Sequence, residues 1–475
     1  MRVAFYTLGC KLNQSESEAL ASTFKSRGFF ITRPQDGADI FIVNSCTVTS
    51  KAEQKARRMI RKLARNNPDA VIIVTGCYAQ LDREAIEALV PNVVVLGHDR
   101  KYQLLDLAQC LEMSEGCSAE ASVEAVQAAV EHCVTGFKSD APEEGGIFRF
   151  AADTYSFHSR AFLKVQDGCD HKCAYCRVRL ARGPSVSLGP DEVAARAAQL
   201  YRRGYNELVL TGVNLTAYRD PDNRRFGLPQ LLNQLTAGPE DYRIRLSSLE
   251  PEMIRSDLIE AVRHARVCPH FHIPVQSGSD RLLKMVHRPY SADRIRQAVA
   301  DLRSAKDDPF LAADVIVGLP GETDEDFQAT YELIKECGFS ALHIFTYSPR
   351  PGTELYNAKN PVPERIAGER AEALRELAAG LESTYAERWI GREVRVLLEE
   401  IHMIGDEEYW GGLSENYLRV EIPIDFFPAA TLPSSLSGTT DSRGETKRAA
   451  PGMHGEVFTV RIESVEEHIF GRLEY

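Results

Sequence analysis

Long hydrophobic runs are missing from this sequence of 475 residues. The longest, such as Val71–Val74 and Val93–Leu96, fall far short of the roughly 20 apolar residues that a membrane span needs. Met1–Tyr6 contains no basic leader and no small-residue cleavage site, so no export signal is expected. These absences predict a cytoplasmic protein without a membrane partner.

An excess of positive charge is also missing. The chain carries 56 basic and 68 acidic side chains, a net charge of −12, so any contact with nucleic acid must come from a local basic surface. Hydrophobic residues make up 44% and charged residues 26%, which excludes global disorder and fibrous repeats. At about 150 residues per domain, the length predicts three domains.

Eleven cysteines in a chain without a visible signal peptide imply a reducing compartment. There, thiols are expected to serve as ligands or nucleophiles more often than as disulfide partners. Five cysteines stand in no recognisable pattern and are expected to be ordinary core or loop residues: Cys110, Cys117, Cys133, Cys268 and Cys337.

Residues 1–111 alternate short β-rich runs with helical patterns, which predicts a parallel, flavodoxin-like sheet in an α/β fold. Strands are expected at 3–8, 40–43, 71–74 and 93–96, and helices at 15–27, 50–66, 82–89 and 101–111. Residues 112–160 follow as an acidic linker or insertion. Between 112 and 144 they hold eight acidic residues and one lysine, with a helical pattern around 119–133.

Residues 161–389 repeat the alternation on a larger scale and predict a partial barrel of about six βα units. Its strands are expected at 162–166, 207–211, 243–249, 271–275, 312–317 and 341–346, before a closing helix at 363–389. Residues 390–475 contain short alternating runs that suggest a small β-barrel. Their segment 428–452 is rich in Pro, Ser, Thr and Gly and predicts a mobile insertion.

The first cysteine constellation is Cys169, Cys173 and Cys176, three thiols in one loop after a predicted strand. Three thiolates leave one iron of a [4Fe-4S] cube open, which suits a cluster that binds a substrate. A zinc site would need a fourth ligand, such as His171. From spacing alone, both an iron–sulfur cluster and a zinc knuckle remain open.

The second constellation is Cys10, Cys46 and Cys77, which are far apart in the sequence. Each lies two or three residues beyond the end of a predicted strand. Because the carboxyl ends of parallel strands meet at one edge of a sheet, these three thiols are expected to converge. The alternative is three unrelated small residues.

The C-x3-C-x2-C motif after the first barrel strand resembles the radical S-adenosylmethionine (SAM) superfamily. The resemblance implies that Cys169, Cys173 and Cys176 hold a [4Fe-4S] cluster whose open iron binds SAM. Tyr175 would then lie near the adenine of SAM. Gly318, in the run Asp314–Glu322, would belong to a glycine-rich strand end that contacts SAM.

The segments Leu8–Glu16, Asn44–Val48 and Thr75–Gln80, followed by the radical-SAM motif, resemble the methylthiotransferases over nearly the whole chain. This likeness implies a second [4Fe-4S] cluster on Cys10, Cys46 and Cys77, and a TRAM-like terminal barrel. The segments Thr7–Lys11, Thr211–Asn214 and Ser247–Pro251 look most like the MtaB type, which acts on threonylcarbamoyl-adenosine in tRNA. Arg177 departs from the apolar residue that is more usual after the third cysteine.

The same resemblance extends to polar residues in the mouth of the barrel. Asn214, Glu250, Gln276 and Ser277 stand at or just after predicted strand ends, where they would contact SAM or the reacting groups. Each could instead satisfy buried backbone groups.

The family chemistry implies how sulfur reaches an adenine carbon whose C–H bond ordinary acid–base residues cannot replace. SAM would serve first as the radical source at the Cys169 cluster and then as the methyl donor. Sulfur would come from the Cys10 cluster. The implied partners are tRNA, an electron donor such as a flavodoxin or ferredoxin, and a sulfur source. Both clusters must then face one cavity.

A basic helix could supply the local positive surface for RNA. Over 50–66, an apolar stripe lies opposite an arc with seven basic residues and a single acidic one, Glu53. Lys51, Arg58 and Lys62 are the candidate phosphate contacts, although a charge-rich face can also be merely solvated.

The leading hypothesis is therefore methylthiolation of threonylcarbamoyl-adenosine in tRNA. Two alternatives keep the chemistry and change its target, to isopentenyl-adenosine in tRNA or to an aspartate of a ribosomal protein. A non-enzymatic alternative is an RNA-binding protein stabilised by zinc in one or both cysteine sets.

Overall fold

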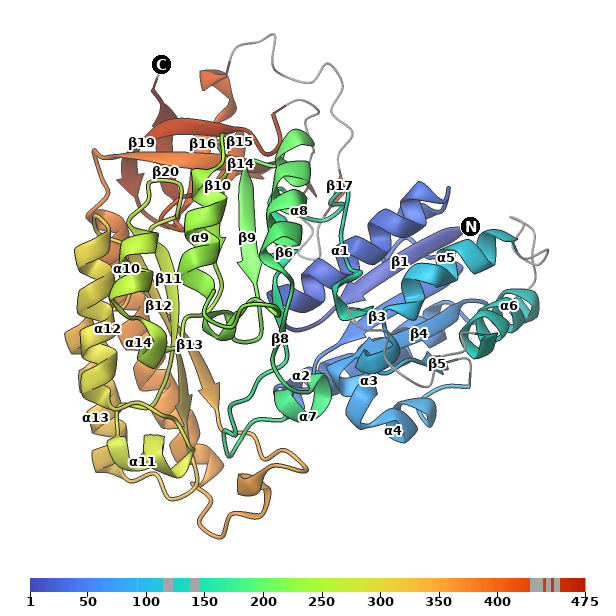
Figure 1. The fold of residues 1–475 in the computed structure, drawn as a ribbon, viewed down its shortest axis with the longest axis horizontal. Helices are drawn as coiled ribbons and strands as arrows, with labels where there is room; N and C mark the ends of the chain where they lie inside the picture. The colour runs from blue at the N-terminus through green and yellow to red at the C-terminus, as the bar shows by residue number, and fades with distance from the viewer. Residues whose placement is uncertain are drawn as a thin grey trace.

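The computed structural model describes residues 1–91, 93–113, 123–136, 146–427, 439–440, 446–447 and 453–474. The chain forms an amino-terminal sheet domain, a central barrel and a terminal barrel, which Figure 1 shows in blue, in green to orange and in red. Among the helices of this described part, none is long and apolar enough to cross a bilayer.

The amino-terminal domain is a five-stranded parallel sheet with the order β2-β1-β3-β4-β5. This order is flavodoxin-like, so the predicted fold class is confirmed here. The sequence pattern missed β2, whose three residues carry no clear alternation. The strands are β1 (Arg2–Thr7), β2 (Phe30–Thr32), β3 (Ile40–Ser45), β4 (Val71–Gly76) and β5 (Val93–Val95).

Helices cover both faces of this sheet, because its central strands are apolar on both sides. One face packs against α1 (Lys11–Ser26), α5 (Gln103–Met113) and α6 (Val123–Gly136). The other packs against α2 (Ser50–Asn66), α3 (Cys77–Leu81) and α4 (Arg83–Glu87). Helix α1 begins four residues earlier than the sequence pattern predicted, directly after Cys10.

The acidic segment differs from a solvated linker in its described part. Val126 and Val130 of α6 are buried in the same apolar core as α1 and α5. Cys110 and Cys133, which were expected to be ordinary core or loop residues, are joined by a disulfide. The physical reason is that α6 folds back onto α5, a tertiary contact that the sequence spacing cannot show.

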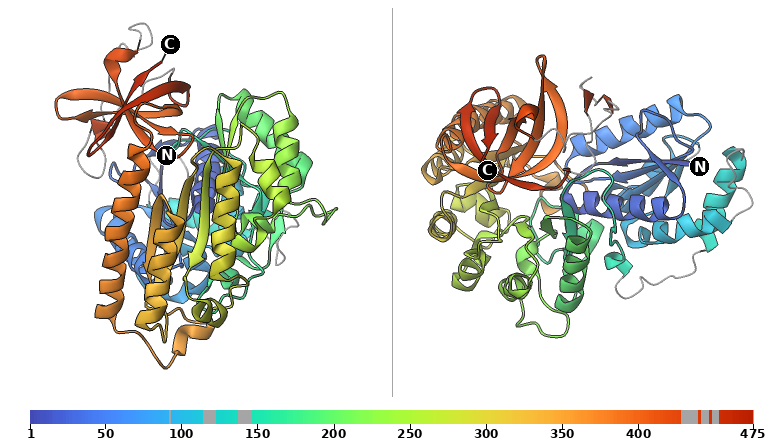
Figure 2. Two further views of the ribbon diagram at one scale, coloured as in Figure 1. Left: turned by 90° about the vertical axis from the view of Figure 1, so that its left-hand side faces the viewer. Right: turned by 90° about the horizontal axis from the view of Figure 1, so that it is seen from above.

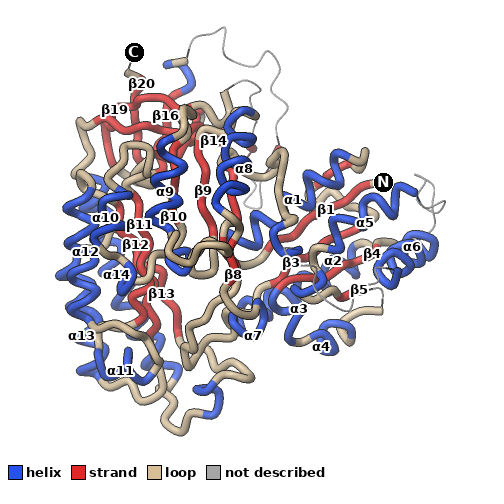
Figure 3. Tube along the Cα trace, viewed as in Figure 1, coloured by secondary structure: helices blue, strands red, loops and turns tan. Residues whose placement is uncertain are grey.

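The central domain contains the six parallel strands that the sequence predicts. Strands β6, β9 and β10 form one sheet and β11, β12 and β13 another, and two isolated parallel bridges, Ile244 to Val267 and Ser248 to His272, connect them. Figure 3 shows the strands curving behind a layer of helices. The strands are β6 (Ala161–Lys164), β9 (Glu207–Thr211), β10 (Arg243–Leu246), β11 (His270–Gln276), β12 (Phe310–Val317) and β13 (Ala341–Thr346).

Side chains alternate between the two faces of these strands. On β12, Leu311, Ala313 and Val315 belong to the outer core that packs against the helices, so Asp314 and Ile316 face the barrel interior. The helices are α8 (Pro190–Arg202), α9 (Leu228–Ala237), α10 (Ser256–Val262), α12 (Ala292–Ala305), α13 (Asp324–Cys337) and α14 (Glu364–Glu387). Short elements at the carboxyl rim are β7 (Gln166–Asp167), α7 (Val178–Arg182), β8 (Val186–Ser187) and α11 (Asp280–Met285).

The terminal domain is a closed barrel, which confirms the predicted small β-barrel, and its five strands have the order β14-β15-β16-β20-β19. It caps the amino ends of the central strands, the end opposite the cysteine loops (Figure 2), where Arg245 donates to the carbonyls of Ser414 and Glu415. The predicted mobile insertion 428–452 lies outside the described residues except 439–440 and 446–447. The strands are β14 (Glu393–Ile404), β15 (Glu407–Ser414), β16 (Arg419–Pro423), β19 (Val457–Val465) and β20 (Ile469–Leu473).

Candidate functional site

Three free thiols gather at the carboxyl edge of the amino-terminal sheet. Cys10 lies between β1 and α1, Cys46 directly follows β3, and Cys77 directly follows β4. A Cβ atom added to Gly9 would lie 2.9 Å from Cys46 Cβ and 3.1 Å from Cys46 Sγ, so the first two loops are in contact. Cys46 also interacts electrostatically with both Cys10 and Cys77. The fold therefore brings these three predicted residues together.

The position of this amino-terminal trio follows from the sheet topology. Strands β1 and β3 are neighbours, yet the chain leaves β1 toward α1 on one face and leaves β3 toward α2 on the other. Ligands in open α/β sheets bind in the crevice at such a switch point. Cys10 and Cys46 line this crevice from its two sides.

The sulfur atoms of the amino-terminal trio receive N–H groups. The backbone N–H of Val48 lies 3.5 Å from Cys46 Sγ, and Arg182 Nε donates to Cys77 Sγ at 3.2 Å. Burial raises the pKa of Cys46 to about 12 and also raises the pKa of Cys77. A bound cation would reverse this effect, because it stabilises the thiolate. N–H donors aimed at sulfur suit metal-bound thiolates.

The central trio lies in the loop between β7 and α7. Cys176 donates its backbone N–H to the carbonyl of Cys173 at 3.0 Å, and electrostatic interactions join Cys169 to both. Gly168 opens the loop with a φ of +69°, and a Cβ atom there would lie 1.9 Å from the carbonyl oxygen of Pro184. Only glycine fits this position, at the turn that opens the loop of the three cysteines.

One predicted SAM contact lies directly beside the central trio. Arg288 places Nη1 3.2 Å from the carboxylate of Glu250 and 3.5 Å from Cys173 Sγ. Burial raises the pKa of Glu250 and raises the pKa of Cys176 to about 12, while the N–H of Val178 lies 3.4 Å from Cys176 Sγ. A carboxylate and a guanidinium at a cluster edge can bind a zwitterionic ligand. The sequence pattern did not identify Arg288.

Three further predicted residues are buried in the barrel wall or packed against it. Gln276 is buried at the end of β11 with a φ of +64°. The hydroxyl of Ser277 lies 3.2 Å from that of Thr330, which satisfies it internally. Tyr175 packs against an apolar cluster of Leu282, Val286 and Leu319.

The last two predicted contacts lie at neighbouring strand ends. Asn214 donates its backbone N–H to Gln166 Oε1 at 2.9 Å. Gly318 donates its N–H to the carboxylate of Glu322 and has a φ of +77°. Both are held in fixed loops at the carboxyl rim, but the structure gives neither a contact with the cysteine trios.

A buried ionic cluster links the two trios. Arg182 donates to Cys77 Sγ, to Asn13 Oδ1 at 2.6 Å and to both carboxylate oxygens of Asp167 at 3.0 Å. Asp167 stands two residues before Cys169. The guanidinium therefore spans from the amino-terminal trio to the chain segment that begins the central trio.

Glu16 lies at the centre of the same cluster and accepts from Arg182 at 3.2 Å and from Lys164 at 2.8 Å. Lys101 is a third partner of Glu16. Although burial opposes ionisation, these three cations hold the pKa of Glu16 well below its usual range. All of these charged groups are fully buried. The sequence analysis included Glu16 only as the end of the Leu8–Glu16 motif and did not identify its three partners.

A second contact joins residues that directly follow cysteines of the two trios. Arg177, next to Cys176, donates to the hydroxyl of Thr47 at 3.3 Å and to Glu53 at 3.2 Å. Thr47 is next to Cys46. This explains the unusual Arg177, whose side chain crosses to the other domain. The two carboxyl rims consequently face one another.

Lys11, the residue after Cys10, reaches toward the barrel interior. Its electrostatic neighbours include Arg245 on β10, Glu207 on β9 and Asp314 on β12. Burial, together with the nearby Arg245 and Arg160, lowers the pKa of Lys11 to about 8. The sequence showed Lys11 only as part of a motif.

The candidate RNA-binding residues Lys51, Arg58 and Lys62 are all exposed on α2. Glu53 is instead buried in the domain contact with Arg177, so it does not dilute the positive charge of the exposed face. The exposed arc is therefore more basic than the sequence count suggested.

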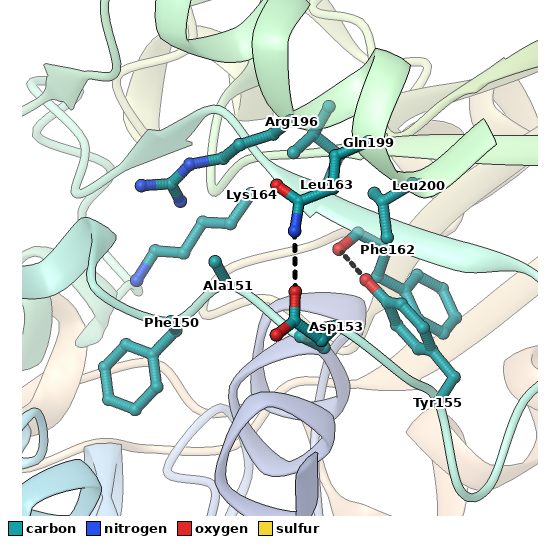
Figure 4. Close-up of a pocket in the computed structure, with 11 residues that line it drawn as sticks. Phe150, Ala151, Asp153, Tyr155, Phe162, Leu163, Lys164, Arg196, Gln199 and Leu200 are labelled. Atoms are coloured by element: carbon teal, nitrogen blue, oxygen red, sulfur yellow. Dashed lines mark hydrogen bonds between the residues drawn. The ribbon is translucent and has the colours of Figure 1, made fainter. Parts of the chain in front are cut away.

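The pocket in Figure 4 lies between the segment 150–155 and strand β6, apart from the cysteine loops. Its volume is about 30 Å³, which holds little more than one or two water molecules. Gln199 donates to Asp153 at 2.7 Å and Tyr155 to the carbonyl of Phe162 at 2.7 Å, and both bonds brace its walls (Figure 4). This pocket is too small for a nucleoside or SAM.

Two family profiles match the chain. Residues 2–97 match the uncharacterized protein family UPF0004, and residues 163–334 match the radical SAM superfamily. The first covers the sheet with the amino-terminal trio and the second covers the central trio and strands β9 to β12.

Curated relatives are similar over most of the chain. A threonylcarbamoyladenosine tRNA methylthiotransferase MtaB from Treponema pallidum (strain Nichols) is 41% identical, over 88% of this chain and 94% of the relative. A protein of the same name from Bacillus subtilis (strain 168) is 36% identical over 98% of both chains.

A solved structure shares the fold. The radical S-adenosylmethionine methyltransferase TsrM from Kitasatospora setae, with tryptophan substrate and a SAM analogue bound, aligns with a TM-score of 0.51 and 14% identity. The alignment covers 78% of this chain and 82% of that one.

Proposed function

The chain belongs to the family of threonylcarbamoyladenosine tRNA methylthiotransferases of the MtaB type, and from this premise we propose its reaction and its site. It transfers a methylthio group to C2 of the threonylcarbamoyladenosine beside the tRNA anticodon, with SAM as both radical source and methyl donor. The observation that supports this most is the bond between Thr47 and Arg177, which brings the loops of the two trios together.

Each trio is suited to one [4Fe-4S] cluster with an open iron, on Cys169, Cys173 and Cys176 and on Cys10, Cys46 and Cys77. The charges beside the second trio fit a thiolate-bound cluster. Three buried cations face only two carboxylates there, so one positive charge remains for the sulfur atoms. The cations are Arg182, Lys101 and Lys164, and the carboxylates are Glu16 and Asp167.

When bound, the two clusters and SAM supply the radical, the sulfur and the methyl group that replacement of an aromatic C–H bond requires. The side chains bind and orient. Glu250 and Arg288 offer opposite charges to the amino and carboxylate groups of SAM beside Cys173. The Arg177–Glu53 and Arg182–Asp167 pairs hold the two rims face to face.

Replacing Gly9 by alanine is expected to prevent the amino-terminal trio from holding its cluster. The new Cβ atom would lie 2.9 Å from Cys46 Cβ, so the Cys10 and Cys46 loops must separate. Iron should fall from about eight to about four per chain, because only the central cluster remains. Iron and sulfide analysis of anaerobically purified protein measures this.

Gly28→Ala is the matched control. Gly28 also has a positive φ, +84°, but no atom lies within 4 Å of an added Cβ. Alanine at a positive φ costs about 1–2 kcal/mol of backbone strain in both variants. Only the Gly9 variant also has the steric clash with Cys46. Equal iron contents in the two variants would contradict the proposed arrangement of the trio.

The exposed arc of α2 is the proposed phosphate-binding surface for tRNA, because this helix follows the Cys46 loop. Replacing Lys51, Arg58 and Lys62 by glutamine is expected to weaken tRNA binding and to reduce the slope of log K against log salt by roughly 2 to 3. Binding titrations at several salt concentrations measure the slope. An unchanged slope would mean that this face is only solvated.

A control variant for this experiment removes the same charge from the outer helices of the barrel. It replaces three exposed basic residues at α8, α10 and α13 by glutamine. These residues are Arg202, Arg263 and Lys335. The expected slope is that of the unmodified protein. A similar reduction in this control would indicate general charge effects.

The proposed reaction also requires partner molecules, and these are part of the proposal. Reduction of the central cluster needs an electron donor such as a flavodoxin or ferredoxin, and each turnover consumes one sulfur atom from a sulfur source. The tRNA substrate implies a cytoplasmic protein.

Mass spectrometry of tRNA nucleosides from a deletion strain tests the proposed substrate. The strain should accumulate threonylcarbamoyladenosine without its methylthio group. A plasmid that carries the gene should restore the methylthio form. Retained methylthio-threonylcarbamoyladenosine would refute the proposal. Loss of the methylthio group from isopentenyl-adenosine, or from a ribosomal-protein aspartate, would favour the corresponding alternative target.

Metal analysis separates the enzyme from the non-enzymatic alternative, a metal-stabilised RNA-binding protein. About four iron and four sulfide per cysteine trio are expected for the enzyme. Zinc without sulfide would instead favour a structural role for the cysteines.

A further inference from the structure

Lys11 is one of the residues that reach from one half of the proposed reaction site to the other. It directly follows Cys10, which is the exposed member of its trio, whereas Cys46 and Cys77 are buried. The accessible side of the trio is therefore the side from which Lys11 extends.

The side chain of Lys11 faces the interior of the central barrel. Its electrostatic neighbours Glu207, Arg245 and Asp314 alternate with residues of the outer core, so they lie on the inner faces of β9, β10 and β12. His270, at the start of β11, also interacts with Lys11. Four different strands thus surround one cation that comes from the other domain.

Lys11 makes no hydrogen bond and no ion pair with any residue that the structure describes. Most of the other charged groups on the inner faces of these strands are paired, so Lys11 differs from them. Its side chain is only partly exposed, as expected for a group that lines an interior space. Such a half-buried ammonium is hydrated, and it is free to bind an anion that enters that space.

The nearby carboxylates already have other partners. Glu207 accepts from Arg243 and Arg245 at 2.5 and 2.7 Å. Asp314 lies 2.9 Å from His272 Nε2 and 3.3 Å from His343 Nδ1.

Positive charge is consequently in excess around Lys11. Arg160, another neighbour of Lys11, lies 3.6 Å from the same Glu207 and 3.2 Å from Glu399, so that two carboxylates are shared by three guanidinium groups. The barrel interior that Lys11 enters from the Cys10 loop is therefore complementary to an anionic group on the substrate.

We propose that Lys11 binds the carboxylate of the threonylcarbamoyl group and so selects this modified adenosine over neutral ones. This rests on the proposed function, in which the adenine lies between the two cysteine trios. A carboxylate on the N6 substituent then lies within the same interior space, and a charge-assisted hydrogen bond to Lys11 fixes the base.

Anticodon stem-loop RNAs test this inference with two forms of the modified adenosine. One carries the threonylcarbamoyl group and the other its uncharged carboxamide. Fluorescence anisotropy with the anaerobically purified, cluster-loaded protein gives the Kd of each. The unmodified protein should prefer the acid by roughly 10- to 100-fold, as expected for a hydrogen bond to a charged group.

Lys11→Met should lower this preference to near unity while leaving the Kd of the amide and the iron content unchanged. Lys11→Arg should keep part of the preference. Lys25→Met, an exposed position on the same helix, should keep all of it. A Lys11→Met protein that retains the preference, or an unmodified protein that lacks it, would overturn the inference.

The same RNAs separate this inference from the proposed function. Formation of methylthio product from the acid stem-loop by the unmodified protein supports the proposed reaction, whatever Lys11 does. Its absence would contradict the reaction, whereas a Lys11-dependent preference in binding would still support the carboxylate site.

Discussion

Replacing Cys173 by alanine is expected to reduce SAM cleavage by more than about 100-fold, because loss of a metal ligand costs more than loss of a supporting contact. Cys173 lies in the loop that carries all three thiols, and its sulfur lies 3.5 Å from Arg288 Nη1, which also binds Glu250. Mass spectrometric detection of 5′-deoxyadenosine in a reaction with reductant, SAM and tRNA measures the loss.

Cys77→Ala is expected to leave SAM cleavage in place and to eliminate the sulfur-containing product. Its thiol belongs to the other trio and contacts Arg182. Cys337→Ala, which replaces a buried free thiol on α13 outside both trios, is the control and should retain both activities. Equal loss of both activities in Cys77→Ala, with the fold intact, would contradict separate roles for the two trios.

The strand ends were predictable because burial on both faces leaves an uninterrupted apolar signal. Ile40–Ser45 and Val71–Gly76 are buried at every position, and the cysteines that follow them are where the sheet topology requires. A parallel sheet collects its carboxyl ends at one edge, so the convergence of Cys10, Cys46 and Cys77 followed from strand order alone.

The charged contacts between the domains were not predictable, because their partners are far apart in sequence. Glu53 was counted as one acidic residue on a basic helix, yet it is buried against Arg177 and Arg350. Its position on α2 gives no sign of this. A buried ion pair needs two elements to meet, and hydrophobic periodicity describes each element only by itself.

The packing of helix α6 was not predicted, for a related reason. Its composition is acidic, so the sequence favoured a solvated linker, but one face carries Val126 and Val130 and meets α5. The sequence of a narrow amphipathic face shows that the helix packs against something, but it does not identify the packing partner.

Replacing Arg182 by methionine is expected to lower the free energy of unfolding by about 3–5 kcal/mol, the usual cost of breaking a buried ion pair from one side. Arg182 is fully buried, and its removal leaves Asp167 and Glu16 with fewer cations in an interior that water does not reach. Denaturant titration followed by circular dichroism measures the change. Arg179→Met on the exposed face of the same short helix should stay within about 0.5 kcal/mol of the unmodified protein.

Arg182→Lys separates the charge of this residue from its geometry. A lysine keeps the positive charge but cannot donate at once to Asp167, Asn13 and the sulfur of Cys77, because its ammonium is a single point. The expected destabilisation is therefore intermediate, with iron lost from the amino-terminal trio before the central one. If Arg182→Met is as stable as Arg179→Met and keeps all its iron, the buried cluster does not hold the two trios together. The domain contact would then depend on Glu53 and its arginines.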